Sequence, residues 1–177
     1  MTAKKIYFAS DFHLGAPNYK ESISREKKIV EWLSEIQVDA SELYLVGDVF
    51  DFWFEWKHAV PKGYVRILGK LAEMCDQGIP IHFFTGNHDL WTFGYLEKEI
   101  GLKIHREPIE VNLQNKLFYI GRRFFKRFFC LMRKGRIYIS FPTICAAKLS
   151  KRWCSQFSKI LIFIFCNTYE QKIFCLL

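Results

Sequence analysis

The stretch "KIYFASDFHLG" (residues 5–15) joins a mostly apolar run to a turn that carries an acid and a histidine. Aromatic, β-branched and small residues fill the run, a composition typical of a β-strand. Two later stretches repeat the design: "ELYLVG" (42–47) leads into "GDVFDFW", and "IPIHFFTG" (79–86) leads into "TGNHDLW". A fourth run, "KLFYIG" (116–121), is also predicted to be a strand. Their near-continuous hydrophobicity predicts strands that are covered on both faces.

The segment between the first two runs predicts an α-helix. In "ESISREKKIVEWLSEI" (21–36), Ile29, Leu33 and Ile36 fall on one helical face, with charged residues opposite. Asn18 stands three residues before Glu21, which is the spacing of a capping box and predicts where the helix begins.

Two more helices are predicted further along the chain. "YVRILGKLAEMCDQG" (64–78) ends in Gly78, a common C-terminal stop, and "LWTFGYLEKEIG" (90–101) is predicted as a shorter helix that ends near Gly101. The alternation of strands and helices predicts an α/β fold with crossover connections, in a chain of one-domain length. The apolar stripe of the longer helix comprises Val65, Leu68, Leu71, Ala72 and Cys75.

Polar side chains follow three of these strands, at the point where each strand ends. Asp11 and His13 follow the first strand, Asp48 follows the second, and Asn87 and His88 follow the third. Ligands of open α/β sheets collect at the carboxyl ends of the strands, so we expect these side chains to converge. Carboxylate and amide oxygens together with imidazole nitrogen suit a divalent metal such as manganese, iron or zinc.

A two-metal phosphoryl-transfer site would use these residue types in a definite way. Asp11 and His13 are separated by one residue, which in an extended chain places both side chains on the same side. A carboxylate such as Asp48 can bridge two metals about 3.5–4 Å apart, which clamp a phosphoryl group and acidify a bound water. His88, beside Asn87, could donate a hydrogen bond or a proton to the phosphate or the leaving group.

Each of these residues, taken alone, has a commoner structural explanation. An isolated acid or histidine after a strand is more often a turn or surface residue, and Asn87 could adopt a left-handed turn. Three strand ends with matching residue types favour the metal site instead. For Asp51 and Asp89 we predict a helix-capping role. The other three histidines are interpreted as ordinary residues: His58, His82 and His105.

The positive charge of the chain is confined to its C-terminal part. Residues 1–121 hold 14 Lys and Arg against 17 Asp and Glu, a net charge of −3. Residues 122–177 hold 12 Lys and Arg and one acid, a net charge of +11, so that the whole chain carries +8. Half of the phenylalanines and five of the six cysteines also lie after residue 121. A basic chain normally points to nucleic acid or an anionic membrane, but here that argument applies to the tail alone.

Three classes of protein are disfavoured. The tail cysteines are 9 to 15 residues apart and no histidine follows His105, which argues against a zinc site. No run approaches the roughly 18 apolar residues of a membrane span. The N-terminal "MTAKKIYFASDFH" lacks the apolar core of a secretory signal, so a cytoplasmic location with reduced thiols is expected.

The blocks "DFH" (11–13), "GDVFD" (47–51) and "GNHD" (86–89), in this order, resemble the first three motifs of the calcineurin-like metallophosphoesterases. Two longer stretches, "DVFDFWFEWKHAVPKGY" (48–64) and "GNHDLWTFGYLEKEIGLKIHREPIE" (86–110), are similar to a narrower group. That group is the UDP-2,3-diacylglucosamine diphosphatases of lipid A synthesis, also called hydrolases. The resemblance covers about residues 5–121.

The resemblance implies a layered α/β sandwich, with mixed sheets flanked by helices, and two divalent metal ions, usually manganese. It implies a cytoplasmic enzyme, peripheral on the inner membrane, that cleaves the pyrophosphate of UDP-2,3-diacylglucosamine to UMP and 2,3-diacylglucosamine 1-phosphate. Asp11 and His13 would bind one metal, Asp48 would bridge both, and Asn87 would bind the second. Asn87 and His88 would contact the substrate phosphate, with His88 in the catalytic role. Neither a nucleic acid nor a protein partner is expected.

Four aromatic residues follow Asp48 closely, and two uses of them stay open. They could contribute to a lipid-facing surface, or they could pack in the core. They are Phe52, Trp53, Phe54 and Trp56.

The family pattern stops at Gly121. After "FYIG" the family carries a Gly-His block, and later a Gly-His-x-His block, which together supply three metal-ligand histidines. This chain has Arg122 in the first of these positions and no histidine after His105. The second half of the family domain is therefore not recognisable. The resemblance then implies a domain truncated in its second half, with about half of its metal ligands, and a chain that is inactive or barely folded.

Two explanations of residues 122–177 stay open. An acid-poor tail rich in Cys and Phe is what out-of-frame translation tends to produce, which predicts a shift of reading frame near Gly121. Alternatively, "RRFFKRFF" (122–129) places four phenylalanines on one helical face and four basic residues on the other, a segment able to lie on an anionic membrane. That second explanation predicts a non-enzymatic peripheral membrane-binding protein, with nucleic-acid binding through the same residues as a third alternative.

Overall fold

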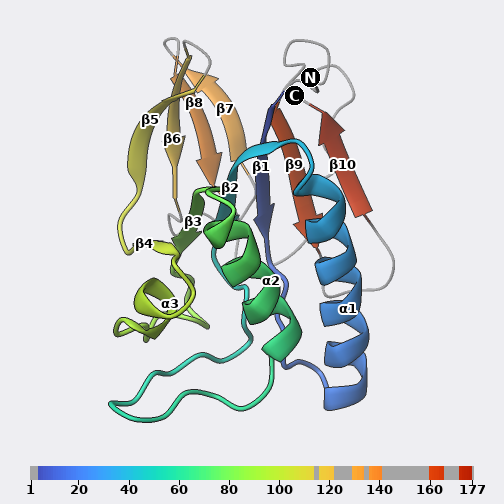
Figure 1. Ribbon diagram of the computed structural model, residues 1–177. Helices are drawn as coiled ribbons and strands as arrows, with labels where there is room; N and C mark the ends of the chain where they lie inside the picture. Colours follow the sequence, from blue (N-terminus) through green and yellow to red (C-terminus); the bar gives the residue numbers. More distant parts are fainter. Residues whose placement is uncertain are drawn as a thin grey trace.

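The computed structural model describes residues 4–113, 116–121, 129–133, 136–140, 160–165 and 172–176. Within these residues the chain forms two β-sheets and three α-helices (Figure 1). The helices are α1 (Tyr19–Ile36), α2 (Val65–Asp76) and α3 (Tyr95–Lys98). The strands are β1 (Lys5–Ser10), β2 (Ala40–Val46), β3 (Ile81–Phe84), β4 (Lys103–His105), β5 (Ile109–Leu113), β6 (Lys116–Ile120), β7 (Phe129–Arg133), β8 (Arg136–Ser140), β9 (Ile160–Phe165) and β10 (Lys172–Leu176).

The first sheet has the strand order β10-β9-β1-β2-β3-β4. Strands β9, β1, β2, β3 and β4 run parallel, and β10 runs antiparallel to β9. Helices α1 and α2 lie side by side over one face of this sheet (Figure 1). Their buried residues, among them Leu33 and Leu71, form the main core together with Leu43, Leu45 and Phe83 of the sheet. This packing holds the carboxyl ends of β1, β2 and β3 at one edge.

The second sheet has the order β5-β6-β8-β7 and packs against the other face of the first sheet. Strands β6 and β8 are parallel, whereas β5 and β7 run antiparallel to their neighbours. Phe118 of β6 stacks near Phe8 of β1 with ring centroids 6.5 Å apart, so the two sheets share buried aromatic contacts. The predicted α/β class and the layered arrangement with mixed sheets are confirmed.

The predicted start of α1 is confirmed in detail. Asn18 is the N-cap, and its side-chain oxygen accepts a hydrogen bond from the amide of Glu21 at 3.0 Å. The Asn18 amide group also donates to the Glu21 carboxylate at 2.7 Å, so the two residues cap each other. Gly78 follows α2 with a φ of 81°, a left-handed conformation that suits a helix stop.

Some of the predicted elements are wrong. The predicted helix over 90–101 is reduced to α3, because residues 90–93 are not helical and Trp91 forms a parallel bridge with Phe54. Val65 is 74% exposed instead of buried, and Ile67 and Met74 take its place in the core. Strands β4 and β5 were not predicted, because both are short and only half-buried. The strand predicted at residues 116–121 is β6, and it lies in the second sheet.

The tail contributes strands to both sheets. Strand β8 pairs with β6, and β9 pairs with β1. The division of the chain into residues 1–121 and 122–177 stays a prediction. Most of the segment predicted as a basic amphipathic helix, residues 122–128, lies outside the described residues. None of the helices in the described part of the chain is long and apolar enough to cross a membrane.

Candidate metal centre

The loops that follow β1 and β2 run beside each other at the carboxyl edge of the first sheet. The amide of Asp11 donates to the carbonyl of Gly47 at 3.2 Å, and the amide of His13 donates to the carbonyl of Asp48 at 2.9 Å. Asp11, His13 and Asp48 have φ angles of 59°, 44° and 52°. A left-handed backbone is uncommon for residues other than glycine and is concentrated at functional sites. The backbone at these three residues therefore has an uncommon conformation, as is typical of a functional site.

Two carboxylates and one imidazole meet where these loops join. His13 Nε2 lies 3.8 Å from Asp11 Oδ1 and 4.0 Å from Asp48 Oδ2. One ligand atom from each of the three residues lies within 4.8 Å of the other two. Asp48 is fully buried and Asp11 is 8% exposed, so water screens their charges poorly. This donor set fits a divalent cation of borderline hardness.

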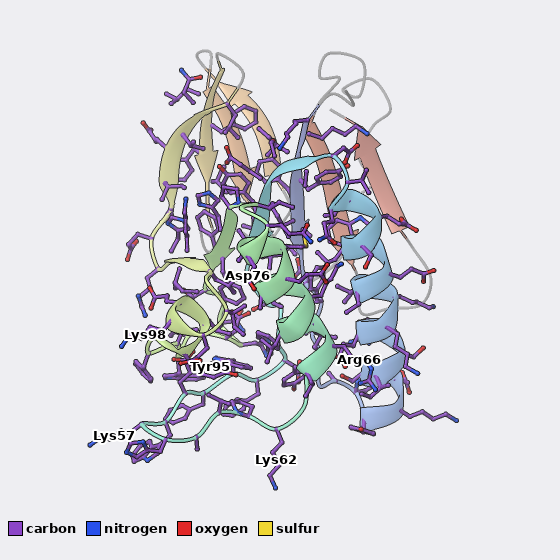
Figure 2. All side chains as sticks on the ribbon, viewed as in Figure 1. Lys57, Lys62, Arg66, Asp76, Tyr95 and Lys98 are labelled. Atoms are coloured by element: carbon purple, nitrogen blue, oxygen red, sulfur yellow. The ribbon has the colours of Figure 1, made fainter. Side chains whose placement is uncertain are left out.

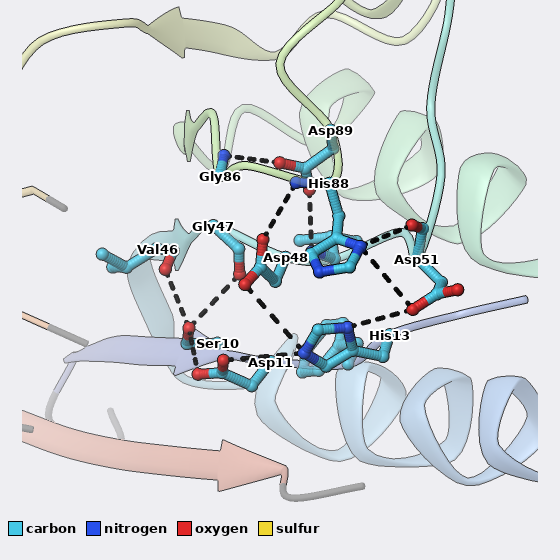
Figure 3. Close-up of polar contacts among 12 residues, drawn as sticks. Ser10, Asp11, His13, Val46, Gly47, Asp48, Asp51, Gly86, His88 and Asp89 are labelled. Carbon is cyan, nitrogen blue, oxygen red and sulfur yellow. Dashed lines mark hydrogen bonds and ion pairs between the residues drawn. The ribbon is translucent and has the colours of Figure 1, made fainter. Parts of the chain in front are cut away.

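Asp51 lies between two imidazoles, as Figure 3 shows. Its Oδ1 lies 3.3 Å from His13 Nδ1 and 3.7 Å from His88 Nδ1. The rings of His13 and His88 meet nearly edge to face, with centroids 5.0 Å apart. Ligand atoms of the three residues also lie within 4.8 Å of one another, so His13 belongs to two adjoining groups of donors. The helix-capping role predicted for Asp51 is wrong, because Tyr64 is the N-cap of α2.

The geometry of His88 fixes the position of one of its protons. Its Nδ1 lies 2.7 Å from the backbone carbonyl oxygen of Asp51. A carbonyl oxygen can only accept, so Nδ1 carries the hydrogen. The Nε2 atom of His88 is then an acceptor in the neutral ring and a donor only in the imidazolium. The backbone amide of His88 donates to Asp48 Oδ1 at 3.3 Å, which joins the β3 loop to the first group of ligands.

The charges around His13 set its protonation. Burial lowers the pKa of His13, but the hydrogen bond with Asp11 and the negative charges of Asp48, Asp11 and Asp51 outweigh burial. The net effect raises the pKa of His13 above its ordinary value. The acidic surroundings thus attract a positive charge, which a proton or a metal ion can supply.

Asp89 holds the β2 and β3 loops together. Its carboxylate is fully buried and accepts hydrogen bonds from the amides of Val49 at 2.8 Å, Phe50 at 3.4 Å and Gly86. Burial raises the pKa of Asp89 to about 6, although the amide hydrogen bonds oppose it, and the charge of Asp48 adds to the rise. The predicted helix-capping role is wrong here too, because these amides belong to two loops.

Two residues that support the site had no signal in the sequence. The Ser10 hydroxyl lies 2.6 Å from Asp11 Oδ2 and 2.8 Å from the carbonyl of Val46. Arg25 of α1 donates through Nη1 to the carbonyls of His13 at 2.8 Å and Ala16 at 3.1 Å. The guanidinium thereby fixes the loop after β1. The carbonyl groups that it binds lie 9 to 13 residues before Arg25 in the chain.

The predicted site residues differ in how closely the structure brings them together. Asp11, His13 and Asp48 form one group, and His88 joins His13 in the second. Asn87 precedes His88 on the same turn and its side chain is exposed. The ligand and substrate-binding roles of Asn87 stay a prediction. Asp51 is the member that the sequence did not predict for this site, although "GDVFD" places it three residues after Asp48.

The comparison with protein families matches one family. Residues 4–160 match the model of the calcineurin-like phosphoesterases. The match includes all the loops of the candidate metal centre and runs beyond Gly121 into the tail.

Several curated relatives share one description. The chain is 47% identical over 117 residues to a UDP-2,3-diacylglucosamine hydrolase of Porphyromonas gingivalis, a match that covers 66% of this chain and 45% of the relative. It is 28% identical over 107 residues to the protein of that name from Nitrosococcus oceani, covering 60% of this chain and 41% of the relative. The chain thus spans less than half the length of these relatives. A crystal structure of a protein of unknown function from Aquifex aeolicus is 19% identical, with a TM-score of 0.47, and covers 70% of this chain and 63% of that chain.

Proposed function

The chain belongs to the calcineurin-like phosphoesterase family, and from this premise we propose that it is a metal-dependent phosphoesterase. The observation that carries the proposal is the meeting of Asp11, His13 and Asp48 within 4.8 Å at the ends of two neighbouring strands. His88 approaches the same point from the third strand. Carboxylates and imidazoles converge in this way when they hold a divalent cation.

The residues would divide the work as follows. Asp11 and His13 would hold one divalent ion, Asp48 would reach two, and Asn87 would complete the second position, with manganese as the preferred metal. The bound ions would supply an acidified water and positive charge against the phosphoryl oxygens. Asp51 would orient His13, because its carboxylate faces His13 Nδ1 and leaves Nε2 directed at Asp11 and Asp48.

His88 would hold the phosphate. Because its Nδ1 already donates to the Asp51 carbonyl, His88 can donate to a phosphate oxygen or a leaving group only through a protonated Nε2. The negative charge of the substrate's pyrophosphate beside the ring would favour that imidazolium. The same atom could then release its proton to the leaving group.

The proposed substrate is UDP-2,3-diacylglucosamine, a nucleotide-linked lipid. The similarity to the Porphyromonas gingivalis protein supports it, since that relative bears the name UDP-2,3-diacylglucosamine hydrolase. Cleavage of the pyrophosphate would release UMP and 2,3-diacylglucosamine 1-phosphate, a step of lipid A synthesis. Such a substrate is consistent with a cytoplasmic protein that binds the inner membrane peripherally.

The tail governs whether this particular chain is active. The chain contains no histidine after His105, so the tail lacks the three later histidines that the family resemblance implies. We propose that the reading frame changes near Gly121, and that the encoded function belongs to the chain with the original frame. The alternative of a non-enzymatic membrane-binding tail receives no support from the comparisons.

The proposal is tested on two chains. A fresh DNA read across codons 110–180 identifies the frame that continues "FYIG" into a Gly-His block, and both the present chain and the frame-restored chain are purified. We expect Mn²⁺ binding by both chains in calorimetry, and release of UMP from UDP-2,3-diacylglucosamine by the restored chain. If the Asp48→Asn variant loses both Mn²⁺ binding and UMP release, these properties belong to this site. Asp76→Asn is the control, because Asp76 is exposed on α2, and this variant should keep both properties. Absence of Mn²⁺ binding in both chains would refute the proposal.

A further inference from the structure

The first half of α1 buries polar side chains, whereas the second half buries apolar ones. Ser22 and Glu26 are 6% and 1% exposed, and Arg25 beside them is half-buried. Ile29 and Leu33 continue the buried face further along the helix. Burial of a polar group costs free energy unless the group is paired, so each of the three polar side chains needs a partner.

Arg25 finds its partners in the loop that carries the first metal ligands. One of its nitrogens, Nη1, donates to three backbone carbonyl oxygens, those of Phe12 at 3.2 Å, His13 at 2.8 Å and Ala16 at 3.1 Å. All three carbonyls belong to residues 12–16. Their convergence on a single nitrogen therefore fixes the shape of this loop from the side of α1.

Ser22 holds the same loop through a second contact. Its hydroxyl oxygen accepts a hydrogen bond from the amide of Gly15 at 2.8 Å. Gly15 has a φ of 115°, which favours glycine, and a Cβ atom at this position would lie 2.7 Å from the hydroxyl oxygen of Tyr64. The loop is thus packed closely between α1 and Tyr64, the residue that precedes α2.

The backbone of His13 is held on both of its sides. Its amide donates to the carbonyl of Asp48 at 2.9 Å, and its own carbonyl accepts from Arg25. The φ of His13 is 44°, a conformation that persists in residues other than glycine only where the surroundings enforce it. The hydrogen bonds from α1 and from the β2 loop supply that constraint, and the direction of the imidazole follows from it.

The charge of Arg25 alone would oppose metal binding. Burial lowers the pKa of the Arg25 guanidinium, and the charges of Glu21 and Asp51 counteract this change. An arginine stays positively charged in a protein, and a positive charge close to a cation site repels the cation. Any favourable contribution of Arg25 to metal binding must therefore come from the hydrogen bonds that it donates to the loop.

We propose that Arg25 and Ser22, which together we call the α1 clamp, are positioning residues of the candidate metal centre. By fixing the loop they direct the His13 imidazole, whose Nε2 lies 3.8 Å from Asp11 Oδ1 and 4.0 Å from Asp48 Oδ2. Loss of a residue that orients a metal ligand typically weakens metal binding by about 10- to 100-fold. The inference rests on the proposed function, because it assigns the α1 clamp to the metal ion of that site.

The test measures the Mn²⁺ affinity of the full chain by calorimetry. Arg25→Met removes the donors and the charge together, and the two effects have opposite signs. Loss of the clamp should lower the affinity by about 10- to 100-fold, whereas loss of a repelling charge alone would raise it. Arg25→Lys keeps the charge and carries three donors on one nitrogen, so it should restore part of the affinity.

Ser22→Ala tests the α1 clamp without any change of charge. The variant removes the acceptor of the Gly15 amide, so the affinity should fall by a smaller factor, about two- to tenfold. Circular dichroism shows which variants are folded. Because Ser22→Ala deletes a single hydroxyl, it keeps the inference testable if Arg25→Met does not fold.

Histidine NMR spectra of the metal-free chains give a second readout. Arg25→Met should shift the ring signals of His13, because the variant releases the carbonyl of that residue. The signals of His82 on β3 should stay in place. A general loss of stability would affect both rings, so this comparison separates positioning from a merely structural role.

Matched controls change the same residue types away from the loop. Arg66 lies at the start of α2 beside α1 (Figure 2), and its Nη1 is 3.7 Å from the Glu26 carboxylate. Arg66→Met thus removes an arginine that pairs with α1 itself. Ser24→Ala removes a hydroxyl from an exposed position of α1. Both controls should bind Mn²⁺ within about twofold of wild type.

The outcomes separate this inference from the proposed function. Absence of Mn²⁺ binding by the wild-type chain would refute the proposed function and this inference with it. If the wild-type chain binds Mn²⁺ and Arg25→Met binds it equally or more tightly, the inference alone is overturned. Equal losses in Arg25→Met and Arg66→Met would overturn it too. Should Arg25→Met not fold, equal affinities of Ser22→Ala and Ser24→Ala would have the same consequence.

Discussion

Two pairs of histidines in this molecule have nearly the same spacing and opposite electrostatic surroundings. The rings of His13 and His88 are 5.0 Å apart and almost perpendicular, at the carboxyl edge of the first sheet. The rings of His82 and His105 are 5.2 Å apart and almost parallel, on the neighbouring strands β3 and β4. Both pairs are partly buried. The difference between them lies in the charges that face the rings.

Carboxylates face the first pair. Asp11, Asp48 and Asp51 all act on His13, and together they raise its pKa although burial opposes them. Excess negative charge of this kind favours the binding of a cation. The pair is therefore suited to metal binding, and its protonated form competes with the metal.

The second pair has a cationic neighbour. Burial, the charge of His105 and that of Lys103 lower the pKa of His82 to about 4. His82 Nδ1 and His105 Nε2 are 2.9 Å apart, which requires one donor and one acceptor and so keeps at least one ring neutral. Glu42 lies 3.8 Å from His82 Nε2, but it also accepts a hydrogen bond from Tyr44. Equal ring spacing thus says little about a histidine's role, whereas the neighbouring charges decide it.

The largest predicted effect concerns the carboxylates of the first pair. Asp48→Asn removes the buried charge that both proposed metal positions share. We expect the affinity for Mn²⁺ to fall by about a hundredfold or more, because a direct ligand should matter at least as much as its supporting residues. Calorimetric titration with Mn²⁺ measures this, and EDTA treatment of the wild-type chain should lower its melting temperature toward that of the variant.

Asp76→Asn serves as the control for that experiment, since Asp76 is exposed on α2. Equal Mn²⁺ affinity in the Asp48→Asn and wild-type chains would mean that the carboxylates around the first histidine pair do not form a metal site, which contradicts the prediction.

A smaller effect is predicted for Asp51, whose carboxylate lies next to Nδ1 of His13, on the side of the ring opposite the proposed metal-binding atom Nε2. Asp51→Ala removes the carboxylate that lies 3.3 Å from His13 Nδ1, and Mn²⁺ affinity should fall by about 10- to 100-fold. Asp51→Asn keeps an oxygen acceptor and should restore part of that loss. Calorimetry on both variants, with histidine NMR signals as a report on ring orientation, separates positioning from bulk charge. If the two variants lose affinity equally, the negative charge of Asp51 matters and its hydrogen bond does not.

The second pair predicts a loss of stability in acid. The unfolded His82 takes up a proton below about pH 6.5, whereas the folded one stays neutral down to about pH 4. The unfolded state therefore binds more protons between these limits, and the free energy of unfolding falls as the pH falls through them. The contribution of His82 is on the order of 2–3 kcal/mol, and His82→Phe should remove it while keeping a ring against Tyr44.

Urea denaturation at pH 7 and pH 5 measures this effect. His58→Gln is the control, because His58 is exposed and outside both pairs. His13 contributes with the opposite sign, since a raised pKa stabilises the folded state at low pH and that stability is lost as the pH rises. The comparison of His82→Phe with wild type cancels this term. An identical pH dependence in both proteins would contradict the prediction.

The sequence predicted those features whose causes are local. The capping of α1 depends on Asn18 and Glu21, which are three residues apart. The strands β1, β2 and β3 follow from short apolar runs, and the meeting of their polar ends follows from parallel strand order. For the same reason the order of residues along the chain suffices to predict that Asp11, His13 and Asp48 lie at one edge of the sheet.

The features that the sequence missed depend on distant partners. Residues 90–93 carry a helical pattern, but the carbonyl of Trp91 accepts a hydrogen bond from the amide of Glu55, 36 positions earlier in the chain, and the helix does not form there. Asp51 faces His13 across a separation of 38 residues. His82 and His105 meet because β3 and β4 pair in a register that places them near each other, and β4 is only three residues long. No local pattern contains these contacts.

The smallest predicted effect changes the charge beside the second pair. Lys103 is exposed on β4, and its charge lowers the pKa of both His82 and His105, after burial in each case. Lys103→Gln should therefore raise both pKa values toward the ordinary value, and by less than full exposure would, because burial remains. The pKa of His13 should not change, since its neighbours are carboxylates at the other site. NMR titration of the ring protons measures all three, with Lys27→Gln on α1 as the control. A common rise that includes His13 would mean that the net charge of the molecule governs these histidines, and that the contrast between the two pairs is not local.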